Sequence, residues 1–372
     1  MPSQTNIAKN VNKIKRNIVS RTVKRHRALV RFGLSAFCLH PFQSGRSNAR
    51  QTIPTARTAT HKLERLLANQ SVATQLSNEL IAFADTTPKT VVNVDHTDAN
   101  YLTSLVGAVQ TGKGRAVPVF VGSTFAHDIP SFGSRHSTKR TDQLRKMRAE
   151  ERKEISWHES IVSTLGCFVE SLGFTPRFAF DRGFGSIAII SYLVSIDAIF
   201  YIRLKSGRIV DDGYQQIRVK DIKEDDEIVE LEDPSGNSPD GKLLLRVVRS
   251  RKSRRCKEPW YILTNDFESG REKIIRIYYH RFEIEESFRD LKHIFEFKRV
   301  RFNKPAHLRV VLLFALLGIS ILHRIRQMLA KTQRKIPRKQ RPKPPNPRKK
   351  LSFVREMYEK YICFNRSVVW SF

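Results

Sequence analysis

The chain has 372 residues, of which 67 are Lys or Arg and 36 are Asp or Glu, so its formal net charge is +31. Such an excess of positive charge indicates a polyanion as the partner. Hydrophobic residues make up 40% of the chain, which excludes a disordered basic tail and allows about two to three domains.

Residues 1–87 are predicted to form a basic, helical DNA-binding region. Thirteen Lys and Arg residues and no acid precede Glu64, a bias typical of phosphate-binding surfaces. Apolar residues at helical spacing predict one helix around residues 14–23 and two more around 63–67 and 72–83. A solvated basic arm packed on the next domain is the alternative explanation of this composition.

Residues 88–205 are expected to form the first part of an α/β domain. Apolar β-branched runs predict strands at 90–95, 101–110 and 115–123, the last two joined by the turn "TGKG". A helix is predicted at 141–172, a strand at 177–181, a helix at 185–196 and a strand at 198–207. The predicted order is therefore β-β-β-α-β-α-β.

Residues 206–270 interrupt this alternation and predict a β-rich insertion. Eight bases and no acid lie between Lys242 and Lys257, so we expect one edge of the insertion to face phosphate. Two helices are then predicted, at 272–297 and 306–329, within a second core part at 271–332. A proline-rich basic linker at 333–350 and a short segment at 351–372 follow.

Two further observations bear on location. The longest apolar run, residues 310–322, is shorter than the roughly 18 residues of a membrane span, so we expect a core helix and no membrane contact. The four cysteines lie too far apart for a zinc motif or a disulfide scaffold, as the sequence shows at Cys38, Cys167, Cys256 and Cys363. Both indicate a cytoplasmic protein.

Two aspartates follow predicted strands. Asp95 comes directly after "VVNV" and Asp181 after "FAF". Carboxylates at strand ends suit a hard cation such as Mg²⁺, which prefers oxygen ligands. Taken singly, either residue is equally well explained as a helix or turn cap.

The segment "YYHRFEIEESFRDLKH" carries the most specific pattern. Tyr278, Arg281, Glu285 and Lys292 are spaced so that one continuous helix would place them on an arc of about 60°. An adjoining apolar stripe is predicted to bury against the sheet, and it consists of Ile277, Ile284, Phe288, Leu291 and Phe295. Glu283 and Glu286 are expected to point away from the arc into solvent, and by spacing alone an ordinary surface helix explains the pattern as well.

These motifs resemble the DDE transposases of bacterial insertion sequences. The pattern Tyr-x2-Arg-x3-Glu-x6-Lys, "DRGF" upstream of it, and Asp95 followed by His96 and Thr97 are similar to the branch with the Tyr-Arg-Glu-Lys signature. The resemblance covers about residues 90–329. It implies an RNase H-like mixed sheet flanked by helices, with a β insertion before the last acidic residue.

The resemblance also implies roles for individual residues. Asp95, Asp181 and Glu285 would be the catalytic triad and hold two divalent metal ions, Mg²⁺ or Mn²⁺ as a substitute. Tyr278, Arg281 and Lys292 would bind the transposon end. Trp260 occupies a place like that of a tryptophan that stacks on a flipped base, although a Trp that opens a strand is more often a core residue.

The sequence therefore predicts a bacterial, nucleoid-associated transposase. It would bind transposon ends and target DNA, cleave by two-metal chemistry and transfer strands by cut-and-paste transposition, as a homodimer in a paired-end complex. An RNase H-like nuclease without strand transfer and a non-catalytic, transposase-derived DNA-binding protein are the alternatives.

Overall fold

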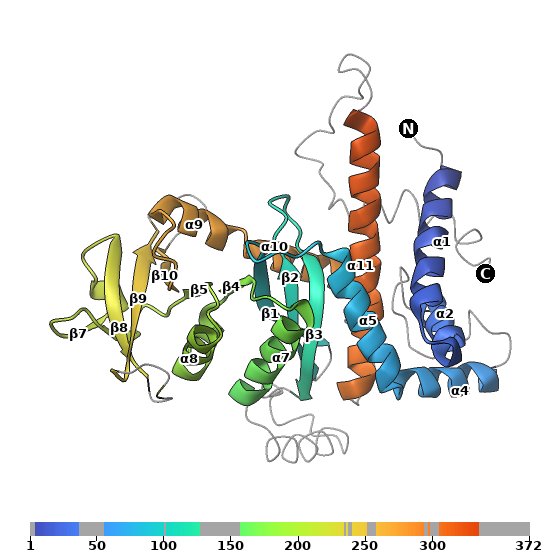
Figure 1. Ribbon diagram of the computed structural model, residues 1–372, viewed down its shortest axis with the longest axis horizontal. Helices are drawn as coiled ribbons and strands as arrows, with labels where there is room; N and C mark the ends of the chain where they lie inside the picture. Colours follow the sequence, from blue (N-terminus) through green and yellow to red (C-terminus); the bar gives the residue numbers. More distant parts are fainter. Residues whose placement is uncertain are drawn as a thin grey trace, which may run out of the picture.

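The computed structural model describes residues 4–36, 56–99, 102–126, 157–233, 236, 240–250, 258–293, 297 and 305–334. Within them the molecule is elongated (Figure 1). The strands of the insertion lie at one end, the α/β core in the middle, and the N-terminal helices at the other end. The predicted linker at 333–350 and the segment at 351–372 lie outside the described residues, apart from residues 333 and 334, which end a helix.

A single ten-stranded mixed sheet organises the molecule, in the order β3-β2-β1-β4-β5-β10-β9-β8-β6-β7. The first three strands are antiparallel, whereas β4 runs parallel to β1 and β5 parallel to β4. The bounds of this half are β1 Val91–Ala99, β2 Leu102–Val109, β3 Val117–Ala126, β4 Arg177–Phe180 and β5 Phe200–Arg203. The predicted order β-β-β-α-β-α-β and the mixed α/β fold class are confirmed, and the arrangement is consistent with an RNase H-like transposase fold.

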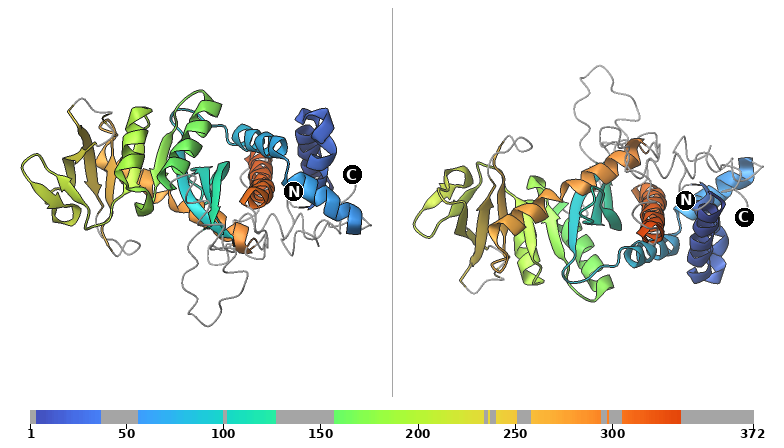
Figure 2. Two further views of the ribbon diagram at one scale, coloured as in Figure 1. Left: turned by 90° about the horizontal axis from the view of Figure 1, so that it is seen from below. Right: turned by 90° about the horizontal axis from the view of Figure 1, so that it is seen from above.

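Helices cover both faces of this half of the sheet (Figure 2). On one face α7 (Trp157–Leu172) and α8 (Ile187–Ser195) bury their apolar side chains against β1, β4 and β5. On the other face lie α9 (Arg271–Tyr279) and α10 (Phe282–His293). The first part of the predicted helix 141–172 lies outside the described residues.

The insertion does not form a sheet of its own. Its strands continue the core sheet because β10 (Tyr261–Thr264) pairs with β5 on one side and with β9 on the other. The remaining strands are β6 Ile209–Asp211, β7 Gln216–Arg218, β8 Asp226–Glu232 and β9 Lys242–Arg249. The strands predicted in this region are therefore present, and they extend the core sheet laterally.

Beyond the other edge of the sheet, the helix α11 (Pro305–Arg334) packs against β3. By length and composition, residues 306–328 of α11 suffice to cross a membrane, but 89% of the apolar window is buried inside the protein. The core helix predicted for residues 310–322 is confirmed by this burial.

The N-terminal helices surround α11 and share one apolar core with it and with α10. They are α1 Gln4–Arg21, α2 Arg27–Ala36, α4 Ala56–Leu67 and α5 Gln70–Phe83. The three helices predicted in this region are present, and α2 is an additional one. The helix α2 carries no acid and few polar residues. Its apolar face is buried in this core and is not solvated.

Candidate active site

Asp95 and Asp181 lie side by side at the carboxyl edge of the sheet. In the parallel ladder between β1 and β4, Val94 pairs with Phe180 as the last register pair. The next residue on each segment is an aspartate. Asp181 directly follows β4, whereas Asp95 lies inside β1, which continues to Ala99 through its pairing with β2, so the strand end predicted at Asp95 is wrong. The carboxyl ends of parallel strands are where ligands bind in open α/β sheets, so the register itself places the two carboxylates at a suitable position.

The helix that carries Glu285 is interrupted, which differs from the continuous helix predicted from the spacing. Between α9 and α10 the backbone forms a short turn at His280 and Arg281, where hydrogen bonds span three residues instead of four. Side chains of the sheet hold this turn. Asn93 donates to the carbonyl of His280 at 3.1 Å, and Gln110 donates to that of Ile277 at 3.0 Å.

The turn places Arg281 among three carboxylates. Its guanidinium lies 3.2 Å from Asp95 Oδ2 and 4.0 Å from Asp181 Oδ1, and it donates to Glu285 Oε1. The Arg281 side chain is only 3% exposed, whereas that of Glu285 is 44% exposed. The structure thus brings together Asp95, Asp181 and Glu285, which come from three separate elements, around one buried cation.

Burial and charge oppose each other at this centre. Burial raises the pKa of Asp95 to about 6, against the effect of Arg281, and the charges of Asp181 and Glu285 raise it further. Burial would lower the pKa of Arg281, but Tyr278 and the three carboxylates raise it above its usual value. Three carboxylates surround one guanidinium, so the centre keeps an excess of negative charge. An added cation would offset this excess.

The oxygen-rich donor set fits a hard divalent cation. Its present arrangement, however, is spread around the guanidinium of Arg281. Among the described residues, no three His, Cys, Asp or Glu side chains lie close enough together to hold a metal ion. Asp95, Asp181 and Glu285 therefore have the right chemistry for a metal ion, and Arg281 has to leave their midst before they can surround one.

Tyr278 and Trp260 are core residues in this structure. The Tyr278 side chain is fully buried, and that of Trp260 is 6% exposed. Their rings lie 5.4 Å apart edge to face, and the ring of Phe282 lies 5.6 Å from that of Trp260. A direct contact of either ring with DNA would require this packing to open.

Lys292 remains on the same helix as Glu285, seven residues further on, and therefore on nearly the same face. It is partly exposed. The buried stripe predicted for this helix is confirmed for Ile284, Phe288 and Leu291, which lie in the core shared with α11. Phe295, the last member of the stripe, lies outside the described residues.

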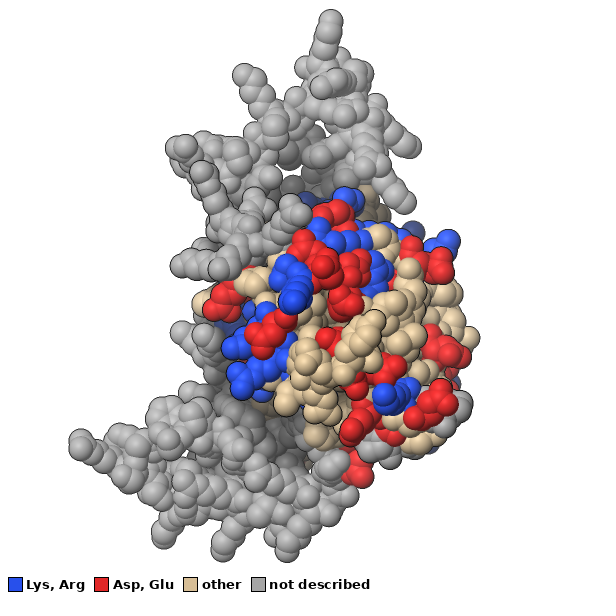
Figure 3. Space-filling view, turned by 90° about the vertical axis from the view of Figure 1, so that its left-hand side faces the viewer, with Lys and Arg blue, Asp and Glu red and all other residues tan. Residues whose placement is uncertain are grey.

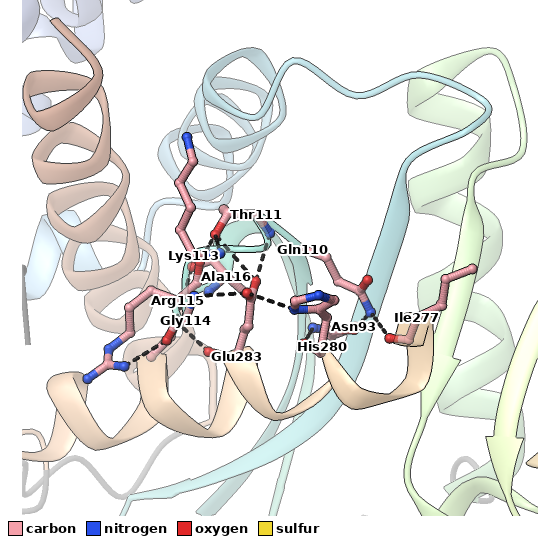
Figure 4. A network of polar contacts seen from close by, with 11 residues as sticks. Asn93, Gln110, Thr111, Lys113, Gly114, Arg115, Ala116, Ile277, His280 and Glu283 are labelled. Carbon is pink, nitrogen blue, oxygen red and sulfur yellow. Dashed lines mark hydrogen bonds and ion pairs between the residues drawn. The ribbon is translucent and has the colours of Figure 1, made fainter. Parts of the chain in front are cut away.

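The prediction that Glu283 is solvated is wrong. Its side chain is 5% exposed and reaches the turn between β2 and β3 (Figure 4). There it accepts hydrogen bonds from the backbone N–H of Thr111 at 2.7 Å and of Gly114 at 2.9 Å. His280 Nδ1 lies 3.3 Å from the same carboxylate. Glu283 thus fastens the turn between α9 and α10 to the sheet.

Glu286 is also not simply solvated. Its side chain is 28% exposed and forms ion pairs with Arg115 at 3.1 Å and with Arg289 at 2.6 Å. Arg115 in addition pairs with Asp290 at 2.7 Å. Of the other nearby acids, Asp98 accepts a hydrogen bond from Thr103. None of these groups contacts Arg281 in the described part of the chain.

The basic edge predicted for the insertion is largely neutralised where the structure describes it. The end of the molecule formed by the insertion shows basic and acidic side chains intermixed (Figure 3). On β9, Lys242 pairs with Glu230 at 2.6 Å, Arg246 pairs with Asp226, and Arg249 pairs with Asp225 at 2.9 Å. The other bases of this run are in residues 251–257, outside the described residues.

A comparison with models of protein families found a match for part of the chain. Residues 164–321 match the family model described as the transposase DDE domain. The matched segment includes Asp181 and Glu285 and begins after Asp95. No curated protein matches the chain. The match covers 158 of the 372 residues, and this part of the chain is similar to the transposase DDE domain.

Proposed function

We propose that the protein is a DNA transposase that binds the ends of its own element, cleaves them and joins them to target DNA. The observation that carries the proposal is the convergence of Asp95, Asp181 and Glu285 at the carboxyl edge of the sheet. Two of these residues lie inside the matched transposase domain. The net charge of +31 favours a nucleic acid as the substrate.

In this proposal Asp95, Asp181 and Glu285 hold two divalent ions, Mg²⁺ or Mn²⁺. Such ions would activate the attacking oxygen and stabilise the leaving oxygen of an in-line phosphoryl transfer. By holding the ions, the three carboxylates would fix the position of the phosphate. First, water attacks the phosphorus and the P–O3′ bond breaks, which leaves a 3′ hydroxyl. This hydroxyl then attacks a phosphorus of the target strand and displaces its 3′ oxygen.

Arg281 has two positions in this scheme. Without ions, it pairs with the three carboxylates and offsets part of their negative charge. With ions bound, the guanidinium would be displaced outward by repulsion between like charges and could pair with a DNA phosphate. Lys292 lies further along the same face of α10 and would contact the same strand. A homodimer that pairs two ends would carry out both reactions together.

The test uses the DNA on either side of the reading frame. Inverted repeats found there are placed on a plasmid, and cleavage and joining to a second plasmid are measured with Mg²⁺ for the wild type, Glu285→Gln and Glu286→Gln. We expect Glu285→Gln to lose cleavage by at least about 10³-fold while it keeps most of its affinity for the ends. The neighbouring Glu286→Gln should remain active.

The outcomes separate the alternatives. Cleaved ends that are never joined to target DNA would favour the RNase H-like nuclease. Binding of the ends without any cleavage would favour the non-catalytic DNA-binding protein. Equal loss of binding and cleavage in Glu285→Gln would contradict a catalytic role for this carboxylate.

A further inference from the structure

A surface hollow of about 560 Å³ lies next to Asp181. Its walls come from the segment that follows β4 and from the segment that follows β5. Arg182 and Ser186 line it from the first segment, and Lys205 and Arg208 from the second. Among the described residues, no acidic side chain lines it.

The hollow has a defined place in the sheet. Strands β4 and β5 are parallel, with Phe180 paired to Ile202 near their carboxyl ends. The segments that follow them therefore leave the same edge of the sheet as Asp95 and Asp181. The hollow continues this edge from the carboxylate centre towards the insertion, on the side away from β1. A strand bound across the edge would pass both places.

Its cations form no ion pair with any acid that the structure describes. Arg182, Lys205 and Arg208 have no carboxylate partner in the part of the chain that the structure describes. The bases of β9 differ, because Lys242 and Arg249 both form ion pairs with acids of the insertion. Three cations around a hollow without an acid favour an anion as the occupant.

Hydrogen-bond donors add to this charge. Ser186 is the residue before the first turn of α8, yet its side chain does not cap the helix, and its buried hydroxyl has no hydrogen-bond partner among the described residues. The first N–H groups of a helix have no partner within the helix and favour anions. A phosphate in the hollow could accept hydrogen bonds from this hydroxyl.

We propose that this hollow binds a backbone phosphate of the DNA strand that is held at the carboxylate centre. The inference rests on the proposed function and adds to it a phosphate site formed by Arg182, Ser186, Lys205 and Arg208. Arginine and lysine contacts to phosphate fix the register of a strand without reading its sequence. The site would therefore set which phosphate reaches the three carboxylates.

The experiment measures binding of a fluorescently labelled DNA duplex by the full chain over a range of salt concentrations. The variants are Lys205→Gln, the double variant Arg182→Gln/Lys205→Gln and the charge-preserving Lys205→Arg. The matched control is Lys89→Gln, because Lys89 is also exposed and precedes β1 at the opposite edge of the sheet. Melting temperatures verify that each variant folds.

We expect the double variant to bind about tenfold more weakly at low salt. The slope of log K against log salt should fall by about 0.9 for each phosphate that the variant no longer neutralises. Lys205→Arg should bind DNA more tightly than Lys205→Gln, with an affinity close to that of the wild type. Lys89→Gln should have the affinity and the salt dependence of the wild type. Cleavage of plasmid-borne ends should move to neighbouring phosphates in the double variant.

The other possible outcomes distinguish failure of the phosphate site from failure of the proposed function. If the double variant and Lys89→Gln bind DNA equally well, the phosphate site is wrong while the proposed function stands. If the wild type shows no salt-dependent DNA binding, both are wrong. If the double variant loses affinity for inorganic phosphate, measured by calorimetry, but keeps its affinity for DNA, the hollow binds free phosphate and the DNA assignment is overturned.

Discussion

Two neighbouring parts of the carboxyl edge carry opposite charge balances. At the carboxylate centre, three acids share the single buried cation Arg281. In the adjacent hollow, three cations line the wall without an acid from the described part of the chain. The first part is short of positive charge and the second of negative charge. In the proposed function, metal ions would supply the missing positive charge and a DNA strand the missing negative charge.

The difference also shows that counting bases along a sequence does not locate positive charge that is unpaired in the fold. The run with eight bases between Lys242 and Lys257 is the densest in the insertion, but its described members are paired with acids on neighbouring segments. The hollow has fewer bases, which are separated in the sequence and meet only because β4 and β5 are adjacent and parallel.

Removal of Arg281 gives the largest expected effect on stability. In Arg281→Met without metal, three carboxylates would be left around an apolar side chain, so we expect a loss of about 3–5 kcal/mol in the free energy of unfolding. Because Mg²⁺ can replace the missing positive charge, it should raise the melting temperature of the variant more than that of the wild type. Urea denaturation and thermal melting with and without Mg²⁺ measure both.

The matched control is Arg289→Met, since Arg289 lies on the same helix but is 62% exposed. It should change stability little and respond to Mg²⁺ as the wild type does. An Arg281→Met protein whose melting temperature is unaffected by Mg²⁺ would argue against the view that the guanidinium stands where cations bind.

Glu283→Gln is expected to have an intermediate effect. The N–H groups of Thr111 and Gly114 donate to different oxygens of Glu283, and the substitution replaces one of these oxygens by a donor, so about 1–3 kcal/mol of stability should be lost. Because Glu283 fixes the turn that carries Arg281, cleavage should also decrease more than end binding does. Glu272→Gln on the exposed side of α9, 77% exposed, is the control. Unchanged stability in Glu283→Gln would contradict the anchoring role.

The pH dependence of stability gives the smallest expected effect. Burial raises the pKa of Asp95 to about 6 in the folded, metal-free protein, from an ordinary value near 4. Between these values the folded state binds the proton and the unfolded chain does not, so stability should fall as pH rises from about 4 to 6. The change should be about 1–2 kcal/mol, measured by urea denaturation with a chelator present, and Asp95→Asn should reduce it.

Local patterns were sufficient to predict much of the fold. The apolar runs gave the core order of strands and helices, and the stripe that includes Ile284 and Leu291 is buried as expected. Asp95 and Asp181 were also identifiable, because an apolar run followed by a carboxylate is a local pattern, although β1 continues beyond Asp95 to Ala99. The resemblance to a known family then grouped them with Glu285.

Contacts between distant segments explain what the sequence could not predict. The helical spacing continues through His280 and Arg281, and the interruption depends on Asn93 and Gln110, which are 187 and 167 residues away from their acceptors. Glu283 lies in a position that helical periodicity assigns to solvent. Only the approach of the β2–β3 turn makes it a buried acceptor.

The core around α11 has a consequence for how the chain folds during synthesis. The apolar faces of α1, α2, α4 and α5 pack on a helix that begins only at Pro305, so the ribosome makes more than 200 further residues after α5 ends at Phe83 before that helix is complete. During this time the first helices lack their main apolar partner. Early chain segments with exposed apolar surface are prone to aggregate, so this protein would depend on chaperones while it is being made.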